Sequence, residues 1–103
     1  MNVKTIGEGI DLTAAAAGSS VDLDGTPFVE GREAVLVVST DALSGATLKV
    51  QSSEDGSTWT DELTVSAQGP ATFRRITCKR YIRYNVTVAG TTGTANAYLL
   101  GSA

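Results

Sequence analysis

Hydrophobic and polar positions alternate in short runs along most of this 103-residue chain. The runs recur about every 8 to 12 residues and are separated by turn-forming Gly, Pro, Asp and Ser, which is typical of all-β sandwiches and barrels. The strands expected from this pattern cover residues 3–6, 9–12, 20–23, 33–39, 46–52, 58–60 with 63–65, 71–77, 80–88 and 94–100. No segment shows a sustained helical period. The pattern therefore predicts a single antiparallel, jelly-roll-like β-sandwich of about eight strands.

Two of the expected strands indicate how the sandwich is organised. Residues 33–39 read Glu-Ala-Val-Leu-Val-Val-Ser, which is apolar on both faces and typical of a central strand covered on each side. Residues 80–88 alternate instead, with Ile82 and Tyr84 expected to point inward and Tyr81 outward. The turn Gln68-Gly69-Pro70 separates two of the later strands.

Trp59 directly follows the turn Glu54-Asp55-Gly56-Ser57, so we expect its ring to cover one end of the sandwich while its N–H donates to a carbonyl oxygen. The residues expected to have structural roles are Trp59, Tyr81, Ile82 and Tyr84.

The N-terminal segment, residues 1–20, is poorer in apolar side chains than the sandwich expected over residues 21–103. We expect it to be an arm or an edge-strand segment, with residues 3–6 and 9–12 paired around Gly7-Glu8 and residues 14–20 forming a linker. Such an arm would order against a neighbouring chain and contribute more to partner binding than to the fold. Its candidate partner contacts are Val3, Ile6, Ile10 and Leu12.

The composition adds limits on compartment and chemistry. Cys78 is the single cysteine, and the first residues do not resemble a signal peptide, which favours folding in a reducing cytosol. No apolar run reaches the ~18 residues that a membrane span requires. Histidine is absent, and no phosphate-binding loop is present, so we expect neither an enzyme nor a cofactor.

Two acidic segments have a partial resemblance to calcium-binding loops. These are Asp22-Leu23-Asp24-Gly25 and Glu54-Asp55-Gly56. Both lack the full ligand set, and Asp-Gly is also an ordinary hairpin-turn dipeptide, so we interpret them as turns and expect no metal site.

Charge is distributed unevenly along the chain. All 11 acidic residues lie in residues 1–62, whereas five of the eight basic residues lie in residues 63–103. This asymmetry suits contact between copies of the chain, most simply as a homotrimer, unless the two halves interleave so that their fields cancel. The five basic residues are Arg74, Arg75, Lys79, Arg80 and Arg83.

That basic cluster has three interpretations. It is a solvated strand face whose charges pair with the acidic half, a binding site for an acidic protein surface, or a binding site for phosphates. A pI near 4.7 and few aromatic residues argue against nucleic acid.

Two resemblances to known families add to this picture. Residues 50–60, with Asp55-Gly56 before Trp59, and the later residues 79–84 together resemble the signature of discoidin-like, galactose-binding-type jelly rolls. That resemblance implies the sandwich architecture and, as an alternative function, a carbohydrate-binding module of a phage tail or fibre.

The whole region of residues 48–101 looks like small structural proteins of tailed bacteriophages, both in its Ala, Thr, Gly and Val content and in its pattern of short strands. This second resemblance implies a capsid decoration, or cement, protein that is made in the host cytoplasm. Such a protein binds the major capsid protein or another virion protein on the capsid surface and braces neighbouring capsomers.

Overall fold

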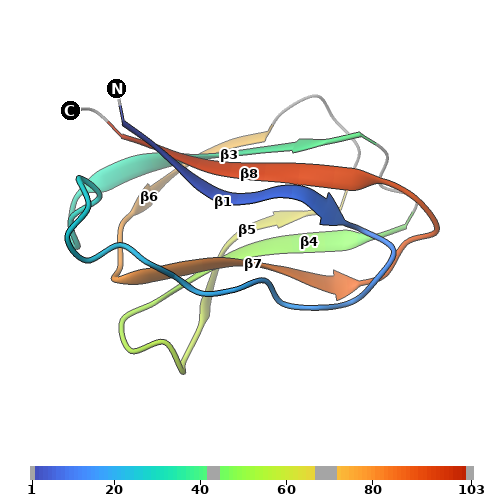
Figure 1. Ribbon diagram of the computed structural model, residues 1–103, viewed down its shortest axis with the longest axis horizontal. Coiled ribbons are helices and arrows are strands. Elements are labelled where there is room, and N and C mark those ends of the chain that lie inside the picture. Colours follow the sequence, from blue (N-terminus) through green and yellow to red (C-terminus); the bar gives the residue numbers. More distant parts are fainter. Residues whose placement is uncertain (1, 42–44, 67–71, 102–103) are drawn as a thin grey trace.

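The computed structural model describes residues 2–41, 45–66 and 72–101, and it confirms the predicted all-β sandwich. Two antiparallel sheets of four strands pack face to face (Figure 1). The strands are β1 (Asn2–Asp11), β2 (Val21–Asp22), β3 (Glu33–Thr40), β4 (Thr47–Ser53), β5 (Thr60–Val65), β6 (Thr72–Thr77), β7 (Tyr81–Val88) and β8 (Thr94–Gly101).

The strand order is β1-β8-β3-β6 in the first sheet and β2-β7-β4-β5 in the second sheet. Among the described strands, β4 and β5 are the one pair that is adjacent both in sequence and in a sheet. Every other connection crosses from one sheet to the other, which is the eight-stranded arrangement of a jelly roll. Each sheet therefore combines strands from the acidic half of the chain with strands from the basic half.

The core lies between the two sheets and follows the period-two alternation. In β3, Ala34, Leu36 and Val38 point into it, and Leu48 and Val50 of β4 face them from the other sheet. The remaining core residues are Ile6, Ile10, Leu12, Leu23, Phe28, Ala46, Leu63, Val65, Ile76, Cys78, Ile82, Val86, Ala95, Ala97 and Leu99.

The expected pairing of residues 3–6 with residues 9–12 is wrong. These residues form the single ten-residue strand β1, which pairs with β8 along its length. The register shifts between Thr5 and Gly7 and again between Gly7 and Ile10, so the alternation changes phase without the chain reversing. Gly9 adopts φ 60°, a backbone conformation that favours glycine, and so permits the second irregularity.

The N-terminal strand is built into the sandwich of its own chain. Ile6, Ile10 and Leu12 are 6%, 3% and 0% exposed, whereas Val3 is 58% exposed. An arm that orders only against a neighbouring chain does not fit this burial. β1 is an edge strand, which was the other form expected for this segment.

The remaining strand predictions agree with the structure to within about two residues. Residues 58–60 and 63–65 contribute to one strand, β5, and Trp59 lies just before it. The expected linker at residues 14–20 contains no helix, and Ala17 forms an isolated bridge to Asn85. The expected turn at Gln68-Gly69-Pro70 and the first residue of the strand expected at residues 71–77 lie outside the described residues.

Candidate protein-interaction surface

The outer face of the first sheet carries a continuous set of apolar side chains. Because Leu36 and Val38 of β3 point into the core, Val35 and Val37 point outward. The register places Val35 opposite Leu100 of β8, and Leu100 opposite Val3 of β1.

The next outward row lies directly beside the first. Val37 is paired with Tyr98 of β8 on one side and with Phe73 of β6 on the other side. We call these six residues of the two rows the apolar band: Val3, Val35, Val37, Phe73, Tyr98 and Leu100.

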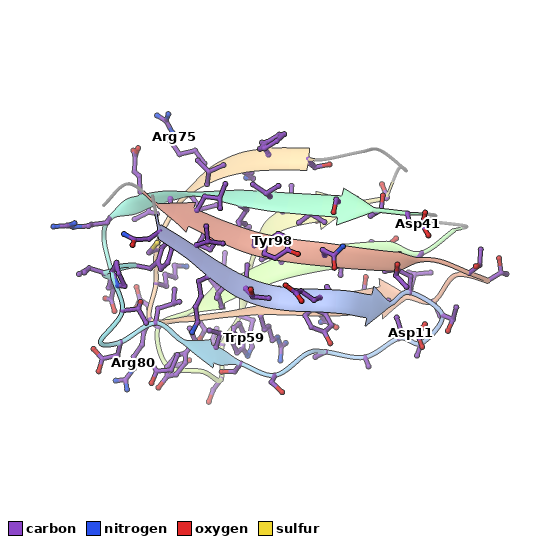
Figure 2. The ribbon with its side chains drawn as sticks, turned by 45° about the horizontal axis from the view of Figure 1, so that its top comes forward. Asp11, Asp41, Trp59, Arg75, Arg80 and Tyr98 are labelled. Atoms are coloured by element: carbon purple, nitrogen blue, oxygen red, sulfur yellow. The ribbon has the colours of Figure 1, made fainter. Side chains whose placement is uncertain are left out.

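The apolar band is accessible in the single chain. Phe73 is 66% exposed and Val3 is 58% exposed, while Val35, Val37 and the other two members are half-buried by their neighbours in the sheet. Figure 2 shows Tyr98 near the middle of this face, and no element of the described chain packs over it. β3 is central in its sheet as predicted, but within the described chain it is covered on one face, not on both.

The outer face of the second sheet is different, because its side chains are polar and bonded to one another. Asp61 accepts hydrogen bonds from Lys49 Nζ at 2.7 Å and from Gln51 Nε2 at 2.8 Å. The Gln51 carbonyl oxygen accepts in turn from Arg83 Nε at 2.9 Å and Asn85 Nδ2 at 3.3 Å. We call these five residues the polar network. The hydrogen bonds from Lys49 and then Gln51 lower the pKa of Asp61.

Trp59 belongs to this polar face. The guanidinium of Arg83 lies 4.2 Å from the centre of the indole ring, which is a cation–π contact. Because Arg83 is on the outer face, the half-buried ring lies over the outside of the second sheet. The expectation that it covers an end of the sandwich is therefore corrected.

The other residues expected to be structural take three different positions. Ile82 is 1% exposed in the core. Tyr84 also points inward, where its ring packs so closely on Gly7 and Gly18 that a Cβ at Gly18 would lie 2.2 Å from it. Tyr81 is half-buried on the outer face, with the guanidinium of Arg80 5.1 Å from its ring centre.

The five basic residues do not form one patch, because the chain crosses between the sheets after β6. Arg74 and Arg75 lie exposed on β6 of the first sheet, and Arg75 forms an ion pair of 3.6 Å with Glu33. Lys79, Arg80 and Arg83 lie on or beside β7 of the second sheet.

Each of these three residues near β7 has its own polar partner. Lys79 Nζ donates to Thr60 Oγ1 at 3.3 Å, and Arg80 pairs with Asp22 at 3.2 Å. The hydrogen bond from Arg80 is the main cause of the lowered pKa of Asp22. Arg83 is held by Gln51 and Trp59 in the polar network.

The two calcium-like segments use their carboxylates within the chain. Asp55 accepts from the backbone N–H of Ser57 and Thr58 at 2.8 and 2.9 Å, and the backbone N–H of Asp24 donates to Asp22 at 3.0 Å. Among residues 2–41, 45–66 and 72–101, no three Cys, Asp or Glu side chains gather as metal ligands. Cys78 is 2% exposed, as expected of a buried small side chain, and burial raises the pKa of its thiol.

Comparisons with protein-family models, with curated proteins and with solved structures find no match for this chain. Within the described segments, no helix is long and apolar enough to span a membrane.

Sequence reasoning missed most of the apolar band. Of the residues proposed as partner contacts, Val3 belongs to it, whereas Ile6, Ile10 and Leu12 are in the core. The apolar character of residues 33–39 on both faces is the sequence signal that could have indicated the apolar band. In a two-sheet jelly roll, one face of each strand points away from the core, so apolar residues on both faces of a strand leave one apolar set on the outside.

Proposed function

We propose that this chain is a non-enzymatic structural protein of a tailed-bacteriophage virion, a cement protein that binds the capsid surface and braces neighbouring capsomers. The observation that carries the proposal is the apolar band on the outer face of the β1-β8-β3-β6 sheet. A contiguous apolar surface on a folded domain marks a place where another protein packs, since its exposure to water is unfavourable and invites aggregation.

The rest of the molecule supports a role in assembly. Jelly rolls are frequent among viral capsid domains, although fold alone does not determine function. Charged side chains such as Asp55, Asp22 and Arg80 stabilise turns and sheet faces within the chain. The sequence also contains no histidine to serve as general base or metal ligand.

The experiment that tests this proposal examines virions of a phage that encodes the chain. Mass spectrometry should detect the chain in purified particles, and cryo-electron microscopy should show density of its size on the capsid exterior. Particles made without the gene should lack that density and open at a lower temperature. If the chain is absent from purified virions, the proposal is wrong.

A second candidate function is a carbohydrate-binding module, and the observation that favours it is the position of Trp59. An indole ring beside Arg83, Gln51 and Asn85 combines an aromatic surface with hydrogen-bonding groups, as sugar sites do. A glycan array separates the two functions: a cement protein should give no specific signal. Selective glycan binding that is lost in Trp59→Ala would favour the carbohydrate-binding function instead.

A further inference from the structure

The edge strands of a sheet have backbone N–H and C=O groups without a partner, which can pair with a strand of another chain. Within the described residues, the edge strands are β1 and β6 in the first sheet and β2 and β5 in the second sheet. Short length, bulges and inward-pointing charged side chains are features that keep such edges from pairing. Each of these four strands has one of these features.

Three of the edge strands are short or irregular. β2 has two residues, Val21 and Asp22. The register of β1 with β8 shifts twice, and the register of β5 with β4 shifts at Glu62, which is an extra residue between Leu63 and Asp61. A bulge bends a strand and increases its twist, so these three edges offer little regular length for pairing.

β6 differs from them, because its six residues pair with β3 without a register shift, and within the described chain no strand pairs with its other side. Its protective feature is Arg74. This residue is paired with Leu36, which is 0% exposed in the core, so the Arg74 side chain leaves the sheet on the core side. Ile76 on the same side is buried, whereas Arg74 is exposed. Among the described residues, no carboxylate forms an ion pair with Arg74.

We propose that the inward-pointing charge of Arg74 prevents the edge of β6 from pairing with the same edge of a second copy. In such a pair the core sides of both sheets lie on one side, so the two-fold axis is perpendicular to the joined sheet and the two β6 strands run antiparallel. Backbone groups that point away from β3 alternate along β6. Opposed residues are therefore both even-numbered or both odd-numbered, and their side chains lie on the same face.

Two registers give the greatest overlap, because each aligns five of the six residues of β6, residues 72–76 in the first and residues 73–77 in the second. In the first register Arg74 lies opposite Arg74 of the second copy, on the core side. In the second register Arg75 lies opposite Arg75 on the outer side, and Arg74 lies opposite Ile76. Like charges directly opposite each other destabilise a strand pair, and a guanidinium on the core side also loses water. Arg74 therefore opposes pairing in both registers, whereas Arg75 places like charges together only in the second.

The test is the self-association of the purified full chain, measured by sedimentation velocity from low micromolar to near-millimolar concentration. Arg74→Thr should strengthen self-association at least about tenfold relative to the parent, because the first register then opposes Thr to Thr, a favourable strand pair, in place of two like charges. Arg74→Gln removes the same charge with a longer side chain and should also associate more strongly than the parent. Thermal melting of each variant verifies that it is folded.

Two variants are matched controls. Arg75→Thr changes the net charge by the same amount as Arg74→Thr but leaves Arg74 in place, so it should associate no more strongly than the parent. Arg74→Lys retains the charge at the decisive position and should behave like the parent too.

Amide hydrogen exchange identifies the edge that is used. In Arg74→Thr, the N–H groups of residues 72–77 that point away from β3 should exchange several-fold more slowly at high concentration than at dilution, because they gain hydrogen bonds across the pair. In the parent their exchange should not depend on concentration.

Three results would overturn the proposal. They are Arg74→Thr that associates no more strongly than the parent, Arg74→Thr that associates without slower exchange in residues 72–77, and Arg75→Thr that associates as strongly as Arg74→Thr. The proposal does not rest on the cement function, because it concerns the edge of the first sheet and not its outer face.

Discussion

At the scale of single residues, acidic side chains stabilise this fold by accepting hydrogen bonds from the chain's own backbone. Asp55 is the best example, because it accepts from the N–H of Ser57 and Thr58 and from the hydroxyl of Ser53. The backbone hydrogen bonds are the main reason that its pKa lies below the ordinary value. The loop between β4 and β5 therefore depends on an ionised carboxylate.

Asp55→Asn should destabilise the protein at neutral pH and make little difference in acid. Because the pKa of Asp55 is lower in the folded chain than in the unfolded chain, its stabilisation is fully present above about pH 4 and is lost as the pH falls through the folded pKa. Urea unfolding at pH 7 and at pH 3 measures the difference. Glu54→Gln removes a charge one residue earlier and leaves the three hydrogen bonds intact, so it should unfold like the parent. An equal loss for Asp55→Asn at both pH values would contradict this account.

Gly18 is required by a close approach. Its N–H donates to the carbonyl oxygen of Tyr84 at 2.9 Å, and an added Cβ would lie 2.2 Å from the Tyr84 ring. Gly18→Ala should lower the free energy of unfolding by about 1 to 3 kcal/mol, as overpacking does. In a Tyr84→Leu background the same substitution should cost much less, and a double-mutant cycle measures this coupling. Equal costs in both backgrounds would show that the ring is not the cause.

At the scale of elements, the alternation of apolar and polar residues located the strands. It could not determine whether an apolar face of a strand packs on the core or lies on the outside of the sandwich. Residues 33–39 are apolar on both faces, and nothing local indicates that only Leu36 and its neighbours would face the core. The sequence pattern predicts two short strands in place of β1, because the register shifts near Gly7 and Gly9 change the phase of the apolar and polar alternation. A reversal of the chain between two strands would change that phase in the same way.

The five basic residues looked like one cluster for a similar reason. Arg75 and Arg83 are eight residues apart in sequence, yet the crossing after β6 places them in different sheets. The sequence pattern does not predict the position of the Trp59 ring, because that position depends on contact with Arg83, which lies 24 residues later in the sequence. Sequence patterns report local geometry, whereas these positions are determined by the order of strands in the sheets.

The burial of β1 predicts that the strand is integral to the fold. Ile10→Ala should cost about 2 to 5 kcal/mol of unfolding free energy, because Ile10 is 3% exposed. Val3→Ala, at a position 58% exposed, should stay within about 0.5 kcal/mol of the parent in dilute solution. Chemical denaturation measures both. Deletion of residues 1–12 should unfold the sandwich, and a deletion that melts like the parent would restore the view of this segment as a partner-binding arm.

At the scale of the whole molecule, the two outer faces differ in chemistry. The face of the second sheet carries the polar network, in which Gln51 bonds to Asp61, Arg83 and Asn85. The outer face of the first sheet carries the apolar band. The sandwich thus has one outer face whose polar side chains are hydrogen-bonded to one another. Its other outer face has apolar side chains that contact with another protein would remove from water.

The most direct test of the central claim is the rate at which hydroxyl radicals oxidise Phe73 in the assembled virion, compared with the free folded chain at high dilution. Phe73 is 66% exposed in the single chain, so it should react readily there. If the outer face of the first sheet is a protein contact, oxidation of Phe73 should fall several-fold in the assembly, and Tyr98 should be protected with it. Equal oxidation of Phe73 in both states would show that this face stays open to water and would contradict the account.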